Sequence, residues 1–147
     1  MEKIEARAFA RAGLLGNPSD GYHGKTISVI VRNFGATVTL NEHPSIQIDS
    51  QAPEINGPRA FENHIDTFGY YGGERLLKAA TRRFFRHCRQ HGLNLPNRSF
   101  AAQFSTDIPR QIGLAGSSAI VIAMLRALAR LYELKISVEA LPQLALE

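Results

Sequence analysis

The sequence predicts an α+β fold in which an antiparallel-rich sheet packs against helices. Two kinds of periodicity support this prediction. Several short segments alternate apolar and polar residues, as strands do, whereas two longer segments repeat their apolar residues at helical spacing. The strand-like segments in the first third of the chain follow one another closely, which is typical of a β-meander.

The first expected strand covers residues 4–11, where Ala6, Ala8 and Ala10 alternate with larger or polar residues. Residues 50–69 show no period and contain prolines and glycines, so we expect an irregular loop there. A further strand at 99–105 precedes a glycine-rich segment. The remaining expected strands are 26–32, 36–40 and 45–49.

Residues 74–90 are expected to form a helix that has one apolar line and one basic line along its surface. The apolar line predicts packing against the sheet. The basic line favours a solvated surface, and it leaves open a second hypothesis, in which the helix contacts nucleic-acid phosphates. The apolar line consists of Leu77, Ala80, Phe84 and Cys88, and the basic line of Arg75, Lys78, Arg82, Arg86 and Arg89.

A glycine-punctuated loop at residues 107–119 leads into a second, strongly apolar helix that extends to Tyr132. Gly113 and Gly116 allow a positive φ or a close approach to a ligand, and serines are favoured at helix starts. Because the amino end of a buried helix presents unpaired N–H groups, we expect it to bind an anion such as a nucleotide phosphate. The expected phosphate-binding residues are Gly113, Leu114, Ala115, Gly116, Ser117 and Ser118.

The segment after the first strand, residues 13–24, is rich in glycine and polar residues. This density of turn residues brings hydrogen-bonding side chains near a backbone that a ligand can approach closely, as in a polyol-binding site. The candidate residues around it are Arg11, Asn17, Asp20, Tyr22, His23 and Lys25.

Size and composition predict one domain of ordinary globular character. The chain has 147 residues, of which 44% are hydrophobic and 20% charged, with no apolar run long enough to span a bilayer. The net charge of +4 fits phosphorylated or carboxylated small molecules as well as nucleic acid. A single cysteine, Cys88, and an amino terminus without an apolar signal core predict a cytoplasmic protein.

Two of these segments resemble motifs of the GHMP kinases, the small-molecule kinases that include galactokinase, homoserine kinase and mevalonate kinase. The run Ala10–Asp20 is similar to the first motif of that family, and Pro109–Ala119 resembles the second, with Ala115 as an extra residue before the paired serines. The resemblance implies the α+β, ribosomal-protein-like two-layer sandwich of the GHMP amino-terminal domain. It also implies transfer of the ATP γ-phosphate to a hydroxyl group.

The resemblance further implies a role for each candidate residue. Arg11 falls on the basic position that stabilises the transferring phosphoryl group, and Ser118 on a hydroxyl ligand of Mg²⁺. Asn17, Asp20, Tyr22 and Lys25 fall on the substrate loop. Asn17 and Pro18 replace the Glu-His pair of galactokinase, and the altered motif looks most like the glucuronokinase branch. We therefore expect a sugar or uronic-acid substrate, whose carboxylate Lys25 or Arg32 would meet.

The end of the sequence predicts another helix that starts at Ser137 and carries Leu141, Leu144 and Ala145 on an apolar stripe. The chain is thus expected to be a GHMP kinase amino-terminal domain over residues 1–147, without the carboxy-terminal domain and its catalytic base. We expect this fragment alone to be inactive and to self-associate through the apolar stripe. The alternatives left open are a non-catalytic fragment and a basic RNA-binding domain.

Overall fold

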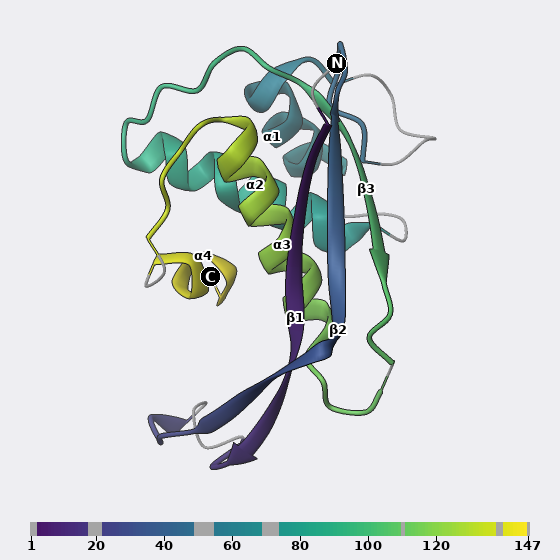
Figure 1. Cartoon of the computed structure of the whole chain (residues 1–147). Coiled ribbons are helices and arrows are strands. Elements are labelled where there is room, and N and C mark those ends of the chain that lie inside the picture. Colours follow the sequence, from purple (N-terminus) through teal and green to yellow (C-terminus); the bar gives the residue numbers. More distant parts are fainter. Residues whose placement is uncertain are drawn as a thin grey trace.

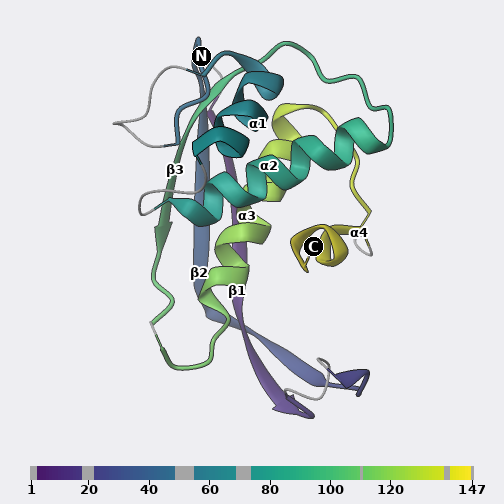
Figure 2. The same cartoon turned by 180° about the vertical axis from the view of Figure 1, so that it is seen from behind.

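The computed structural model describes residues 3–17, 22–48, 55–68, 74–109, 111–137 and 140–146. They form a three-stranded antiparallel sheet in the order β1-β2-β3, and Figures 1 and 2 show the helices on one face of it. The α+β fold class is therefore confirmed. The elements in chain order are β1 (Lys3–Leu15), β2 (Ile27–Glu42), α1 (Gly57–Phe68), α2 (Arg75–Gln90), β3 (Phe100–Thr106), α3 (Gly116–Leu131) and α4 (Ala140–Leu146).

The core lies between the sheet and α3. Alternate residues of β1 and β2 are buried there, and those of β1 are all alanines, which allow the helix to approach closely. The helix contributes a correspondingly apolar face and is the element nearest to the two long strands. The buried strand residues are Ala6, Ala8, Ala10, Ala36, Val38 and Leu40.

The two strands expected at 26–32 and 36–40 are one continuous strand, β2, so the prediction of a break between them was wrong. Phe9 pairs with Gly35 and the next residue, Ala10, pairs with Val31, which leaves residues 32–34 as a bulge in β2. Bulges bend the strand that carries them. On the far side of the bulge at residues 32–34, the β1–β2 hairpin extends away from the helices (Figure 1).

The strand expected at 45–49 is reduced to isolated bridges. Ile46 bridges Ile55 in antiparallel sense, and Gln47 bridges Ala101 of β3 in parallel sense. This segment therefore lies beside β3 rather than next to β2, and the simple meander was wrong. Asp49 lies outside the described residues.

Part of the expected loop at 50–69 is the helix α1. Its buried residues Phe61 and Ile65 are one helical turn apart, and the Phe61 ring packs edge-on against Phe85 of α2. Pro58 stands in the first turn, where its missing N–H is not needed. Among the described residues, no helix is long and apolar enough to cross a membrane.

The expected helices near residues 74–90 and 119–132 are present as α2 and α3, and the expected strand at 99–105 is β3. Ser137 accepts a hydrogen bond from the backbone N–H of Ala140 at 3.1 Å, close to the start of α4. Leu144 is buried, so the apolar stripe of this helix is covered at that position. Self-association of the chain stays a prediction.

Candidate functional site

The loop before α3 has an unusual backbone. Gln111, Gly113 and Ala115 have φ values of 61°, 77° and 54°, a left-handed conformation that costs about 1–2 kcal/mol in a residue other than glycine. Such strain is found most often at functional sites. The left-handed Ala115 followed by the helical Gly116 is a combination that can turn successive N–H groups toward one anion.

Two expectations about this helix start need correction. The residue with the positive φ next to the helix is Ala115, whereas Gly116 has no such φ. No side chain caps the helix, so neither Ser117 nor Ser118 acts as a capping residue. The N–H groups of the first turn therefore have no side-chain partner at the cap, which suits an incoming phosphate.

Hydrogen bonds to the sheet hold both ends of the loop. At its beginning, the Asp107 carboxylate accepts a hydrogen bond of 2.6 Å from the Gly35 N–H, and the Ile108 N–H donates to Thr106 Oγ1 at 3.1 Å. At its end, the Arg11 N–H of β1 donates to the Leu114 carbonyl oxygen at 3.1 Å. The loop is thus fastened to both β2 and β1.

A large hollow, which we call the loop hollow, opens on one side of the helix start. It has a volume of about 580 Å³ and is lined by both polar and apolar residues. All the predicted phosphate-binding residues except Ser118 line it. Its walls are Arg75 and Leu76 of α2, Phe104 and Thr106 of β3, loop residues Ile108, Pro109, Gln111 and Gly113–Ala115, and Gly116, Ser117 and Ile120 of α3.

A second hollow lies on the other side, at the free edge of β1, and we call it the strand-edge hollow. It has a volume of about 210 Å³. Arg11 and Ser118, which are 107 residues apart in sequence, both line it. The Arg11 guanidinium donates to Ser28 Oγ at 3.2 Å. The other lining residues are Ala8, Phe9, Ala10, Ile30, Ala115, Ala119, Ile122 and Arg126.

The predicted substrate loop is not brought to these two hollows. Asn17, Tyr22 and Lys25 are exposed and line neither of them, and Asp20 lies outside the described residues. Arg32, expected to meet a carboxylate, stacks on the Phe9 ring at 5.8 Å from its centroid. The substrate roles of Asn17, Asp20, Tyr22 and Lys25 stay predictions.

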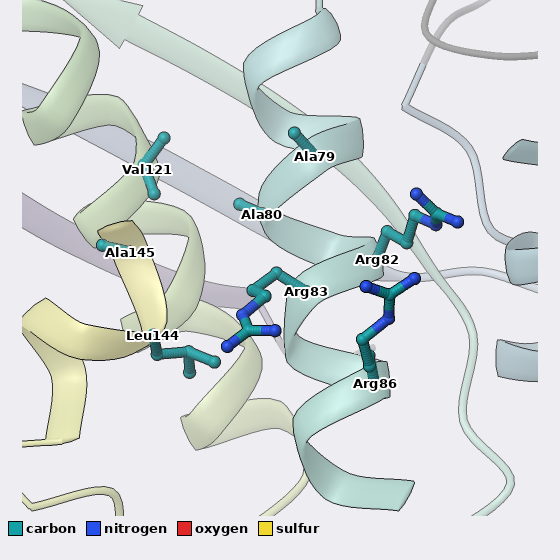
Figure 3. Close-up of a pocket in the computed structure, with 8 residues that line it drawn as sticks. All are labelled: Ala79, Ala80, Arg82, Arg83, Arg86, Val121, Leu144 and Ala145. Atoms are coloured by element: carbon teal, nitrogen blue, oxygen red, sulfur yellow. The ribbon is translucent and has the colours of Figure 1, made fainter. Parts of the chain in front are cut away.

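The basic line of α2 is not a uniform free surface. Arg82 pairs with Asp66 and Arg89 with Glu62, both of α1, and Lys78 is buried. Figure 3 shows Arg83 pointing toward Leu144 of α4, while Arg82 and Arg86 point to the other side. A nucleic-acid strand would therefore not meet one continuous row of cations, which argues against the RNA-binding alternative.

Two residues of the site were not anticipated from the sequence. Asp107 fastens the loop, and Arg126 lines the strand-edge hollow. A signal for Arg126 was present, because Ser118, Ile122 and Arg126 are spaced four residues apart and share one helix face. That spacing did not predict which way the Arg126 side chain points, or that the edge of β1 lies beside it.

Comparison with known proteins finds sequences that are similar to this chain. Residues 75–147 match the family model described as GHMP kinases N terminal domain. Glucuronokinase 1 of Arabidopsis thaliana is 40% identical over 149 residues, which include 97% of this chain, and probable glucuronokinase 2 of the same plant is 39% identical over 156. The chain spans 41% of the length of each of these relatives.

Solved structures show the same fold at lower sequence identity. The Lactococcus lactis galactokinase complexed with galactose superposes with a TM-score of 0.72 at 16% identity, covering 98% of this chain and 36% of that one. The Methanococcus jannaschii mevalonate kinase gives 0.69 at 17% identity, covering 98% and 44%. Both matches support the two-layer fold described above.

Proposed function

Because this chain belongs to the GHMP kinase family, we propose that the intact protein is an ATP-dependent sugar or sugar-acid kinase, with a uronic acid such as glucuronate as its substrate. The chain supplies the amino-terminal domain of that enzyme. The single observation that carries the proposal is the position of the α3 start between two hollows. One hollow is lined by the predicted phosphate loop, and the other by Arg11 and Ser118.

We assign ATP to the loop hollow and the acceptor to the strand-edge hollow. The backbone from Gly113 to Gly116 would bind the phosphates, since left-handed and helical residues in succession form an anion-binding concavity. The γ-phosphate would then lie at the helix start, next to the second hollow. This arrangement brings donor and acceptor together across the first turn of α3.

Phosphoryl transfer breaks the bond from the γ-phosphorus to the bridging oxygen and forms a bond to the acceptor hydroxyl oxygen. Arg11 lines the acceptor hollow, and from there its charge would stabilise negative charge that develops in the transition state. A general base must take the proton of the acceptor hydroxyl. We assign this base to the part of the protein that corresponds to the rest of the glucuronokinase relatives, of whose length this chain spans 41%. The cytoplasmic location expected from the sequence stays a prediction.

Magnesium fits this site only together with the nucleotide. The described residues contain no cluster of three or more His, Cys, Asp or Glu side chains. The Ser118 hydroxyl would be one protein ligand, and phosphate oxygens and water would complete the octahedral set that Mg²⁺ prefers. When bound, the ion neutralises phosphate charge.

A pair of neighbouring serines tests the assignment. In the intact protein, Ser118→Ala should still bind an ATP analogue, but its affinity should depend less on Mg²⁺ and sugar-phosphate formation should fall at least about tenfold. Ser117→Ala is the matched control, because phosphate binding in the loop hollow is assigned to the backbone, which this substitution keeps. Its Mg²⁺ dependence should be that of the wild type, and its loss of activity should be smaller than that of Ser118→Ala. Equal losses in both variants, or no ATP-dependent sugar phosphorylation by the wild-type protein, would contradict the proposal.

A further inference from the structure

Strand β1 forms one edge of the sheet, and two arginines of α3 lie along that edge. Arg126 donates to the Arg7 carbonyl oxygen at 3.0 Å, and Arg130 donates to the Glu5 carbonyl oxygen at 2.5 Å. The two arginine donors are one helical turn apart on α3, and their two carbonyl acceptors are two residues apart on β1. Each arginine therefore covers one main-chain acceptor of this edge.

The two arginines differ in what else they reach. Arg126 lines the strand-edge hollow together with Arg11 and Ser118, whereas Arg130 is not part of its walls. Ser118 and Arg126 lie on the same face of α3, about 12 Å apart along its axis. Helical side chains lean toward the amino end, so Arg126 extends from its backbone toward Ser118.

The charge of Arg126 is not neutralised by its hydrogen bond, because the Arg7 acceptor is a neutral carbonyl. A guanidinium has five N–H donors in a planar fork, and this bond to Arg7 uses one of its nitrogens. The fork suits a carboxylate, which accepts two parallel hydrogen bonds. Ala119 and Ile122 line the same hollow, and apolar walls strengthen such a contact.

We propose that Arg126 binds the carboxylate of the acceptor and so selects a sugar acid over a neutral sugar. This inference rests on the proposed function, in which the strand-edge hollow receives the acceptor. Ser118 marks the end of the hollow where the phosphoryl group arrives, and Arg126 marks the other. The acceptor then binds with its reacting hydroxyl toward Ser118 and its acid group toward Arg126. Arg126 replaces Lys25 and Arg32 as the carboxylate partner.

The test compares two substrates of nearly the same shape, one with a charged carboxylate and one with a neutral amide in its place. Kinetics of the intact protein are measured with D-glucuronate and with the neutral D-glucuronamide, for the wild type, Arg126→Ala, Arg126→Lys and Arg130→Ala. Loss of a charge-assisted contact should lower kcat/KM of Arg126→Ala for glucuronate about 10- to 100-fold, with little change for the amide. Arg126→Lys should recover part of the loss, and Arg130→Ala should behave as the wild type with both substrates.

Arg130→Ala separates recognition from edge covering, since it removes the equivalent hydrogen bond outside the hollow. Equal losses for both substrates in Arg126→Ala, or the same pattern in Arg130→Ala, would overturn the proposal. Calorimetric titration with D-glucuronate alone gives a readout that does not need turnover. Binding that depends on Arg126 without any phosphorylation would support the carboxylate site and contradict the kinase assignment, and absence of glucuronate binding to the wild type would overturn the carboxylate site.

Discussion

The Asp107 carboxylate accepts a hydrogen bond from the Gly35 N–H at 2.6 Å, and this contact joins the beginning of the phosphate loop to β2, directly after its bulge. The Thr106 hydroxyl donates to the Gly35 carbonyl oxygen at 3.2 Å, so both main-chain groups of Gly35 are used. A Cβ on this glycine would lie 2.9 Å from the Ala8 carbonyl oxygen, which is closer than real contacts allow. The position after the bulge therefore requires glycine, because there is no space for a Cβ.

We expect Gly35→Ala to destabilise the protein by about 1–3 kcal/mol, because the backbone of β1 must shift to admit the methyl group. Asp107→Ala should lower the free energy of unfolding by about 1–3 kcal/mol, because the Gly35 N–H is left without its acceptor. Asp107→Asn should lower it less, because it keeps an acceptor oxygen. Urea unfolding followed by circular dichroism measures all three. Wild-type stability in Gly35→Ala would contradict the close contact.

Gly116→Val should weaken nucleotide binding without unfolding the protein. Gly116 does not need a positive φ, and a Cβ there would meet Ile108 Cγ2 at an ordinary 3.5 Å. The added methyl groups would instead occupy part of the loop hollow, which both residues line. We expect the affinity for an ATP analogue to fall at least about tenfold, with a nearly unchanged melting temperature.

The matched control for this prediction is Ala115→Gly, which relaxes the left-handed backbone and should keep nucleotide binding. Calorimetric titration of both variants gives the comparison. Unchanged nucleotide affinity in folded Gly116→Val would contradict the phosphate-loop assignment.

The sequence was sufficient for β1, α2, β3 and α3 because each has a clear period over most of its length. It was not sufficient for α1, where Gly57 and Pro58 were interpreted as loop residues. Proline is equally at home in the first turn of a helix, and the spacing of Phe61 and Ile65 was the signal that should have decided. The segment around the bulge of β2 was interpreted as a break between two strands for a similar reason, since Asn33, Phe34 and Gly35 interrupt the alternation without ending the strand.

The site was predictable where the backbone alone defines it and not where distant elements meet. Gly113 was expected to allow a positive φ, and its φ is 77°. The left-handed Ala115 was unforeseen because alanine rarely adopts that conformation. The placement of Arg11, Ser118 and Arg126 around one hollow depends on the packing of α3 against β1, which no local pattern encodes.

Cys88 should be unreactive in the folded protein. The thiol is buried on α2, and burial raises its pKa to about 11, so only about a thousandth is thiolate at pH 8. We expect almost no alkylation by iodoacetamide at pH 8 without denaturant, and complete alkylation in guanidinium chloride. Rapid labelling of the native protein, measured by mass spectrometry, would show that this part of α2 opens readily.

His87 should make the fold less stable in mild acid. Burial lowers its pKa from the ordinary 6.5, and the nearby charges of His91 and Arg83 lower it further. The unfolded chain then binds a proton at His87 more readily than the folded chain, so the free energy of unfolding decreases as the pH falls below about 6.5 toward the folded pKa. The ring centroids of His87 and His91 lie 4.1 Å apart.

We expect His87→Gln to remove this part of the pH dependence. Urea unfolding at pH 7.5 and at pH 5.5 gives the difference in stability for each protein, and that difference should be smaller in the variant than in the wild type. His91→Gln should have an effect of the same sign but smaller, since it leaves burial, the largest cause of the His87 shift, in place. If His87→Gln loses as much stability from pH 7.5 to pH 5.5 as the wild type does, His87 takes up its proton as readily in the folded protein as in the unfolded chain.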